Sequence, residues 1–449
     1  MEKFVTEAHQ AAAKEAIRRL VNIESVLDES KAAPGQPFGP GPVAALDEVL
    51  KICGGLGFKT YKDPAGYYGY AETGSGEELF GLLCHMDVVP AADQSGWETN
   101  PFEMIERDGL MIGRGTQDDK GPSMAALFAV KALMDAGVVF NKRVRFIFGT
   151  DEENLWRCLA KYNENGEEAI TMGFAPDAEF PLIYAEKGLL DAYLIGPGST
   201  EFEIHAGSAL NVVPDKAVLS KMSSEVAELV KEKLTKLGFD FVAEDDTITV
   251  NGKGIHSMKA PEGVNALCRL AMAMSDVIVF GPLDFLGRLV GEDATGESVV
   301  GRIEDVQSGG LTMNFATLDV TPEETRIGVD MRIPVSFSKE DVAEKLRVKA
   351  LEYGLAYEEF DYLAPLYVPV DSALVQTLMS VYREFTGDMT EPMVSGGATF
   401  ARMMKNTVAF GAMFPDTPDF MHQANEQWSL ENLYKVMDIY AEAVYRLCV

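Results

Sequence analysis

EELFGLLCHMD (residues 77–87) is followed along the chain by PSMAALFAVKALMDA (122–136) and then by RVRFIFGT (143–150). The first and third stretches are short and apolar, which is typical of buried strands. The second stretch predicts a helix, with Pro122 suited to its first turn and Gly137 to its end. Because strand, helix and strand follow in this order, we predict an α/β fold with a mostly parallel central sheet.

The pattern changes after about residue 188. Segments such as DAYLIG (191–196) and ETRIGVDMRIPV (324–335) indicate strands, whereas SEVAELVKEKLTKLG (224–238) and KEDVAEKLRVKALEYG (339–354) indicate amphipathic helices. This mixture predicts a separate α+β domain in the middle of the chain. Helical and strand patterns resume after the prolines of PLYVPVDS and continue to the C-terminus.

Composition restricts the classes of function. The chain has 449 residues, 39 Lys and Arg against 70 Asp and Glu, and a net charge of −31, while 47% of its residues are hydrophobic. So many apolar residues predict packed cores, and so large an acidic excess argues against binding to nucleic acid or to anionic membranes. Five scattered cysteines and an N-terminus without the apolar core of a signal peptide predict a soluble, cytoplasmic protein.

Two short acidic motifs could carry chemistry. His85 ends the first predicted strand with Asp87 two residues later, an arrangement that suits a metal site because a carboxylate can orient the imidazole. A surface turn with a chance acidic neighbour explains this pair equally well. Asp118 and Asp119, in GRGTQDDKGP, stand just before the predicted helix, a position that favours anions even without a metal.

Three further motifs extend the set. They are GTDEEN at the end of the second predicted strand, PDAEF with Asp177, and MHQANE with His422 and Glu426. Each is weak alone, because acidic runs occur by chance in so acidic a chain. Together they matter, since functional groups gather at the carboxyl ends of parallel strands. Two histidines and several carboxylates suit a pair of divalent ions, with Zn²⁺ the best fit, and a carboxylate shared between them is typical of a hydrolase.

The motifs also match a known family. The chain resembles the bacterial PepV-like dipeptidases, within the superfamily of co-catalytic zinc aminoacylases, desuccinylases and carboxypeptidases. The matching stretches run in family order from about residue 36 to residue 430: HMDVVPAADQSGWETNPFE, GRGTQDDKGPSMAA, GTDEEN, GFAPDAEFPLIYAEKG, NVVPD, IHSMKAPEGVNA, VDMRIPV, SGGATFAR and MHQANE. The series is specific, although no single member would be.

The resemblance implies a ligand set for two zinc ions, for which Mn²⁺ or Co²⁺ are possible substitutes. Asp118 would bridge both ions. His85 and Asp177 would complete one site, and Glu153 and His422 would complete the other.

The resemblance also implies roles for neighbouring acids. Glu152 would be the general base that takes a proton from the water bridging the two ions, and Asp87 would steer His85. Adjacent acids on an extended segment point in opposite directions, so one acid can bind metal while the other faces substrate. Asp119 and Asp151 are then expected to be neighbours of the ligands.

Three candidates in the middle domain follow from the same resemblance. His256 would stabilise the oxyanion of the tetrahedral intermediate, Asn211 would lie near that oxyanion, and Arg332 would bind the substrate's free carboxylate in bidentate fashion. Each residue has a plainer explanation: a solvent-facing turn for His256, a turn cap for Asn211, and an ion pair at a sheet edge for Arg332.

The turn SGGAT could offer backbone amides to the same carboxylate. Its candidate residues are Gly396, Gly397 and Thr399.

We therefore predict a catalytic domain formed by residues 1–188 and 367–449, with an inserted lid domain at 189–366, in a monomer whose lid closes to assemble the site. The expected reaction is hydrolysis of the peptide bond of unblocked dipeptides. Two alternatives stay open: an N-acyl-amino-acid deacylase or carboxypeptidase-like amidohydrolase of the same superfamily, and a catalytically silent relative that binds metal or peptide.

Overall fold

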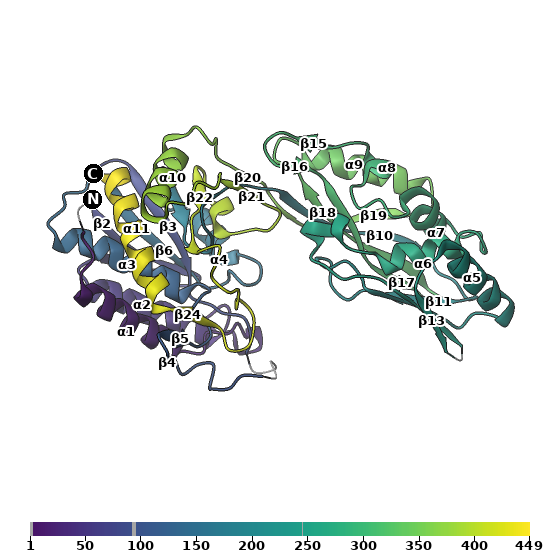
Figure 1. The fold of residues 1–449 in the computed structure, drawn as a ribbon, viewed down its shortest axis with the longest axis horizontal. Helices are drawn as coiled ribbons and strands as arrows, with labels where there is room; N and C mark the ends of the chain where they lie inside the picture. Colours follow the sequence, from purple (N-terminus) through teal and green to yellow (C-terminus); the bar gives the residue numbers. More distant parts are fainter. Residues whose placement is uncertain (1–2, 92–95, 245) are drawn as a thin grey trace. The chain divides into compact units, whose positions relative to one another are not determined.

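The computed structural model describes residues 3–91, 96–244 and 246–449, so residues 92–95 of the first matching motif lie outside the described part. The chain forms two compact units (Figure 1). Unit 1 comprises residues 1–184, 367–393 and 398–449, and unit 2 comprises residues 185–366 and 394–397.

The segment 394–397 differs from the sequence expectation, which placed everything after residue 366 in the catalytic domain. It groups with unit 2, where Arg332 Nη1 donates to the Gly396 carbonyl at 2.9 Å, although the short strand that contains its first residues (β21, Met393–Ser395) pairs with β9 (Ile183–Glu186). The Lys187 amide donates to the Ser395 carbonyl at 3.1 Å, which continues this pairing beyond the strand.

The main sheet of unit 1 confirms the predicted α/β class. Its four central strands, in the order β6-β3-β7-β22, are parallel, and antiparallel neighbours flank them on both sides. The strands of this sheet, in its order, are β1 (Lys59–Lys62), β2 (Tyr68–Gly74), β6 (Arg143–Gly149), β3 (Leu79–His85), β7 (Met172–Ala175), β22 (Thr407–Ala409), β9 and β20 (Leu366–Tyr367). Every residue of β3 is buried, as its unbroken apolar run predicts.

The predicted crossover helix joins β3 to β6. Helix α3 (Lys120–Asp135) is buried along nearly its whole length, and helices α1 (Glu7–Val21) and α11 (Leu430–Cys448) pack against it. Both chain ends lie in this unit (Figure 1), where the rings of Phe4 and Tyr445 are 5.2 Å apart. The remaining helices of unit 1 are α2 (Pro40–Gly55), α4 (Arg157–Glu164), α10 (Ala373–Thr386) and the short turns η1 (Glu29–Lys31) and η4 (Phe400–Met403).

Two small sheets support the loops around the carboxyl ends of the main strands. They consist of β4 (Ile105–Arg107), β5 (Leu110–Ile112) and β24 (Gln427–Ser429), and of β8 (Ala178–Glu179) and β23 (Ala412–Met413). Because β24 pairs with β5, the loop between β23 and β24 is held next to the segment between β5 and α3.

Unit 2 is an antiparallel α+β domain. Along β10, buried and partly exposed residues alternate, so one face of its sheet packs against helices and the other does not. The sheet order is β13 (Phe241–Glu244), β14 (Thr247–Asn251), β12 (Lys216–Ser220), β11 (Glu203–Ala206), β17 (Thr312–Val320), β18 (Glu324–Ile333), β10 (Gly188–Pro197), β19 (Ala356–Leu363). The other elements are α5 (Ser224–Leu237), η2 (Ser257–Glu262), α6 (Ala266–Met274), α7 (Gly281–Asp284), η3 (Phe285–Val290), α8 (Glu297–Val300), α9 (Lys339–Leu351), β15 (Glu304–Asp305) and β16 (Gly309–Gly310).

A serine side chain caps the N-terminus of at least one helix in each unit. Ser429 begins α11 and accepts a hydrogen bond from the Asn432 amide, and Ser223 does the same for Val226 in α5. Every helix in the described part of the chain is too short or too polar to cross a lipid bilayer.

Candidate metal centre and active site

The parallel strands of unit 1 deliver polar side chains to one edge of the sheet. His85 is the last residue of β3, Glu153 follows the end of β6, and Asp177 follows the end of β7. These three strands are neighbours, so their carboxyl ends meet. Asp118 precedes α3, and His422 lies in the loop between β23 and β24.

These five side chains form two groups that share one residue. In the first group, His85 Nε2 lies 2.9 Å from Asp118 Oδ1 and 3.5 Å from Asp177 Oδ2. In the second, His422 Nε2 lies 3.0 Å from Asp118 Oδ2 and 3.0 Å from Glu153 Oε2. The two oxygens of Asp118 therefore face different histidines, which is the geometry expected of a bridging carboxylate.

The chemistry of this donor set fits two divalent cations. Three carboxylates and two imidazoles lie within a few ångströms of one another, and oxygen and nitrogen donors of these kinds are ligands for Zn²⁺ and related ions. Carboxylates crowded together in a buried place repel one another unless positive charge compensates them. Hydrogen bonds to these carboxylates raise the pKa of both histidines, which favours their protonated forms.

The pKa values reflect this balance. Burial alone would raise the pKa of Asp118, but hydrogen bonds from His422 and His85 outweigh it and hold that pKa below its usual range. Hydrogen bonds to Asp118 and Glu153 raise the pKa of His422 to about 11. Burial and the charge of Asp118 raise the pKa of Glu153 to about 7, although His422 opposes the shift. The centre thus attracts positive charge.

Asp87 supports the centre in two ways. His85 Nδ1 lies 3.0 Å from the main-chain oxygen of Asp87, whereas the Asp87 carboxylate is 3.6 Å from that nitrogen. Donation from Nδ1 to this carbonyl leaves the lone pair of Nε2 for a metal. The Asp87 carboxylate instead accepts the Glu153 amide at 3.1 Å, which links the two groups of ligands.

The other acids of the motifs hold the loops in place. Asp119 accepts hydrogen bonds from the His85 amide and the Ser123 hydroxyl. Asp151 is fully buried and binds the Arg157 guanidinium through both carboxylate oxygens, at 2.7 and 2.9 Å. Neither acid belongs to the two groups found among the described residues.

Glu152 lies in the sequence between Asp151 and the proposed ligand Glu153. Burial raises the pKa of Glu152 well above its usual range. The positive charge of His85 opposes this rise, and the negative charges of Asp177 and Glu153 add to it. A carboxylate with a high proton affinity suits a group that must accept a proton.

Glu426 is a feature that the sequence did not assign. Its carboxylate is fully buried and accepts hydrogen bonds from the loop that carries Asp118. The only signal in the sequence was its place at the end of MHQANE, where an acid four residues after His422 looks like one more surface charge.

The candidates of unit 2 gather although they are far apart in sequence. The Asn211 carbonyl accepts the Ser257 amide at 2.9 Å, and the Ser257 hydroxyl accepts a hydrogen bond from Arg332 Nη2 at 3.1 Å. His256 is exposed, and its Nδ1 accepts the Met258 amide at 3.2 Å. Partial desolvation of the imidazole, which remains in part exposed, and the charge of Arg332 lower the pKa of His256. Because Nδ1 accepts the Met258 amide, the neutral ring carries its proton on Nε2.

The Arg332 guanidinium is engaged on most of its edges. It is buried on β18 and binds Asp330 through Nε at 2.8 Å and Nη2 at 2.6 Å. Nη1 donates to the Gly396 carbonyl at 2.9 Å. Asp330 therefore occupies one of the two edges that can bind a carboxylate through two parallel bonds, and the donors of the other edge reach the Gly396 carbonyl and the Ser257 hydroxyl.

The turn after β21 is also internally bonded. The Gly397 amide donates to Ser395 Oγ at 2.9 Å, and Thr399 Oγ1 accepts the Ala401 amide at the start of η4. These contacts fix the shape of the turn.

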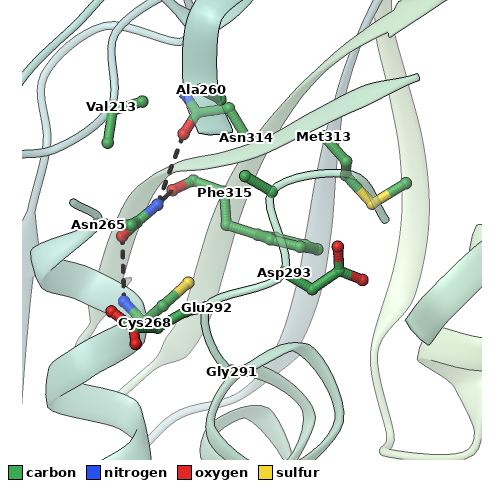
Figure 2. Close-up of a pocket in the computed structure, with 11 residues that line it drawn as sticks. Val213, Ala260, Asn265, Cys268, Gly291, Glu292, Asp293, Met313, Asn314 and Phe315 are labelled. Atoms are coloured by element: carbon green, nitrogen blue, oxygen red, sulfur yellow. Dashed lines mark hydrogen bonds between the residues drawn. The ribbon is translucent and has the colours of Figure 1, made fainter. Parts of the chain in front are cut away.

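A separate small cavity lies in unit 2 (Figure 2). Asn265 lines one wall, where it accepts the Cys268 amide at 3.0 Å and donates to the Phe315 carbonyl at 2.8 Å. None of its lining residues is a predicted site residue, so the cavity is not part of the candidate centre.

Comparison with solved structures defines the class of fold. The chain is similar to an aminoacylhistidine dipeptidase from Vibrio alginolyticus, with a TM-score of 0.61 and 12% identity over 98% of this chain and 97% of that one. It is also similar to the di-peptidase Dug1p from Saccharomyces cerevisiae, with a TM-score of 0.60 and 14% identity over 98% and 96% of the two chains. The YXEP protein of Bacillus subtilis, described as a dinuclear metal binding peptidase, has a TM-score of 0.53 at 12% identity over 99% of both chains. At such low identity these likenesses establish the fold.

Sequence comparison defines the family. The pattern of the peptidase family M20/M25/M40 matches residues 81–446, and this chain belongs to that family. A Staphylococcus epidermidis protein named "Putative dipeptidase" is 38% identical over an alignment 464 residues long, which covers 97% of this chain and 97% of that one. A protein of the same name from Staphylococcus aureus is 38% identical over 462 residues, or 96% of each chain.

Proposed function

We propose that this protein is a metal-dependent dipeptidase of the PepV-like kind, which hydrolyses the peptide bond of unblocked dipeptides with two zinc ions. The observation that carries the proposal is the pair of ligand groups that share Asp118, with one carboxylate oxygen toward each histidine. The names of the staphylococcal relatives support the choice of dipeptides as substrates.

The two metals, when bound, would supply positive charge that polarises the substrate's carbonyl group and lowers the pKa of the attacking water. The chain's own residues provide the proton transfers. Glu152 accepts the proton of that water on a carboxylate oxygen and later delivers it to the nitrogen of the leaving amine. The high proton affinity that burial gives Glu152 favours the first of these transfers.

Asp87 acts by holding ligands in place. Its main-chain oxygen fixes the His85 ring, and its carboxylate fixes the Glu153 amide. Ligands held in this way need no rearrangement when an ion binds, which raises metal affinity.

The residues of unit 2 would bind the substrate. His256 donates a hydrogen bond from Nε2 to the carbonyl oxygen of the substrate, which becomes negatively charged during the reaction. Asn211 lies close to His256, because its carbonyl accepts the Ser257 amide. Asp330 holds the guanidinium group of Arg332 in place, and this group attracts the terminal carboxylate of the dipeptide. The turn with Gly396, Gly397 and Thr399 is proposed to contribute to the same subsite.

A paired substrate assay tests the reaction. The protein, stripped of metal with a chelator and reloaded with Zn²⁺, Mn²⁺ or Co²⁺, is incubated with free dipeptides and with N-acetylated amino acids. We expect metal-dependent cleavage of the free dipeptides. Preference for the N-acetylated compounds would establish the deacylase alternative, and two bound ions without turnover of either class would establish a silent relative.

Two further properties are part of the proposal. Five free, buried cysteines support a cytoplasmic location, because thiols stay reduced there. We also propose a monomer that acts on small amide substrates and binds neither nucleic acid nor membranes, in keeping with its net charge of −31.

A further inference from the structure

A buried carboxylate joins two loops of unit 1 that carry proposed metal ligands. Glu426 Oε1 accepts the amides of Gly115 at 3.0 Å, Gln117 at 2.8 Å and Asp118 at 3.3 Å. Its other oxygen accepts a hydrogen bond from Arg114 Nη1 at 2.7 Å. One side chain therefore receives four hydrogen bonds from the segment 114–118, and one of the donors is the amide of the proposed bridging ligand.

A second set of contacts runs between the same two loops. The Gly113 amide donates to the main-chain oxygen of Glu426 at 2.9 Å. The Gln117 side chain donates to the Pro418 carbonyl at 2.9 Å and accepts the Phe420 amide at 2.9 Å. The segment that contains Asp118 is thus bonded to both ends of the segment that contains His422.

Neither loop can keep its shape through a regular element. Both Asp118 and His422 lie outside helices and strands, and His422 and Asn425 have positive φ angles of 60° and 59°. Residues other than glycine adopt this conformation at an energetic cost, which their surroundings must offset. The buried hydrogen bonds of Glu426 are contacts of the kind that can offset this cost.

We propose that Glu426 is a positioning residue that sets the distance between Asp118 and His422, and thereby the affinity of the centre for its metal ions. The proposal rests on the proposed function, because it requires these two residues to be ligands. Glu426 would act by holding the two loops together and would not bind the ions itself. The 3.0 Å distance between His422 Nε2 and Asp118 Oδ2 depends on how these loops are joined.

The simpler alternative is that Glu426 only stabilises the fold as the partner of buried Arg114. Unit 1 offers a matched comparison for that role. Glu72 binds Arg145, which is also buried, through Nε at 2.8 Å and Nη2 at 2.6 Å, and this pair joins β2 to β6. Loss of charge at Glu72 disturbs a part-buried ion pair without touching a loop that carries a ligand.

The test compares Glu426→Gln with Glu72→Gln. Glutamine keeps the shape of the side chain, but it has one acceptor oxygen where glutamate has two, so it cannot serve both the three amides and Arg114. Each metal-free variant is titrated with Zn²⁺ by calorimetry, and its unfolding in urea is followed separately. We expect Glu426→Gln to weaken zinc binding about 10- to 100-fold, the range typical of groups that orient ligands. Glu72→Gln is expected to lower stability and leave zinc affinity at the wild-type value.

A second variant covers the case in which Glu426→Gln does not fold. Gln117→Ala removes the other side-chain link between the loops without leaving a buried charge unpaired, and it should weaken zinc binding in the same direction by a smaller factor. The positioning role is overturned if a folded Glu426→Gln protein binds zinc with wild-type affinity. If that variant is unfolded, wild-type affinity in Gln117→Ala overturns the role instead. Either result leaves the proposed metal centre unaffected. A wild-type protein that binds no divalent ion overturns both.

Discussion

Replacement of Asp118 by asparagine should affect two metal ions at once. Asp118 is the one residue that belongs to both ligand groups found in the described residues. The substitution leaves each group with one carboxylate and one histidine, and it turns one of the two coordinating oxygens into an amide nitrogen that cannot bind a cation. Asp177→Asn is the control, because Asp177 belongs only to the group of His85.

The size of the effect can be bounded from the geometry. Loss of a residue that merely orients a ligand costs about 10- to 100-fold in metal affinity. Asp118 approaches both histidines directly, at 2.9 and 3.0 Å, so its loss should exceed that range. We expect each of the two binding steps to weaken by more than about 100-fold, or about 2.7 kcal/mol. In Asp177→Asn only one step should weaken.

Calorimetric titration of the metal-free proteins with Zn²⁺, together with metal analysis after dialysis, measures both steps. Circular dichroism of each metal-free variant checks that the fold is intact. If Asp118→Asn loses a single ion, as the control is expected to do, Asp118 does not bridge the two sites. If it keeps two ions at wild-type affinity, the proposed centre is wrong.

Three other predictions test individual side chains. Glu152→Gln should lower kcat for a dipeptide by about 10²–10⁴-fold with metal content unchanged, and activity close to wild type would exclude Glu152 as the base. Arg332→Lys should raise KM for dipeptides by about 10- to 100-fold without loss of metal, because lysine cannot keep both bonds to Asp330. Loss of metal in this variant would refute a role in substrate binding. Burial and the charge of Asp330 raise the pKa of Asp191 to about 7. The folded protein therefore keeps a proton that the unfolded chain releases near pH 4. As a result, the contribution of Asp191 to stability falls as the pH rises from about 4 to 7. Asp191→Asn should therefore be more stable than wild type above pH 7 by on the order of 1 kcal/mol in urea unfolding, and an unchanged difference between pH 4 and pH 8 would contradict the shift.

Much of the fold follows from local patterns. The predicted strand, helix and strand between residues 77 and 150 are β3, α3 and β6, because an apolar run bounded by polar residues has few other ways to be buried. Helix α3 begins at Lys120, which places Pro122 in its first turn as predicted, where the missing proline amide leaves no intrahelical hydrogen bond unmade. Strands β1 and β2 were not predicted, because β1 is polar and exposed or partly exposed, and β2 mixes buried residues with glycines and polar residues, so neither shows an apolar run.

The candidate site was predictable in its membership and less so in its contacts. His85 ends β3 and Glu153 follows the adjacent parallel strand β6, so their proximity follows from sheet topology. That His85 binds the main-chain oxygen of Asp87, and that Asp330 occupies one edge of Arg332, could not be read from the motifs. Residue types and spacing specify which groups are available, but they do not specify which of several nearby acceptors a donor will choose.

By itself, the sequence determined much of the succession of strands and helices, the class of fold and the candidate polar residues at the ends of the parallel strands. Those features depend on periodicity and on neighbours in the chain, which local sequence encodes. The tertiary structure alone decided that Glu426 is buried and bonded to the loop of Asp118, more than 300 residues away. Whether a carboxylate lies in solvent or in a shell of amide donors depends on how distant loops pack, because burial is a property of the assembled molecule and of no single segment.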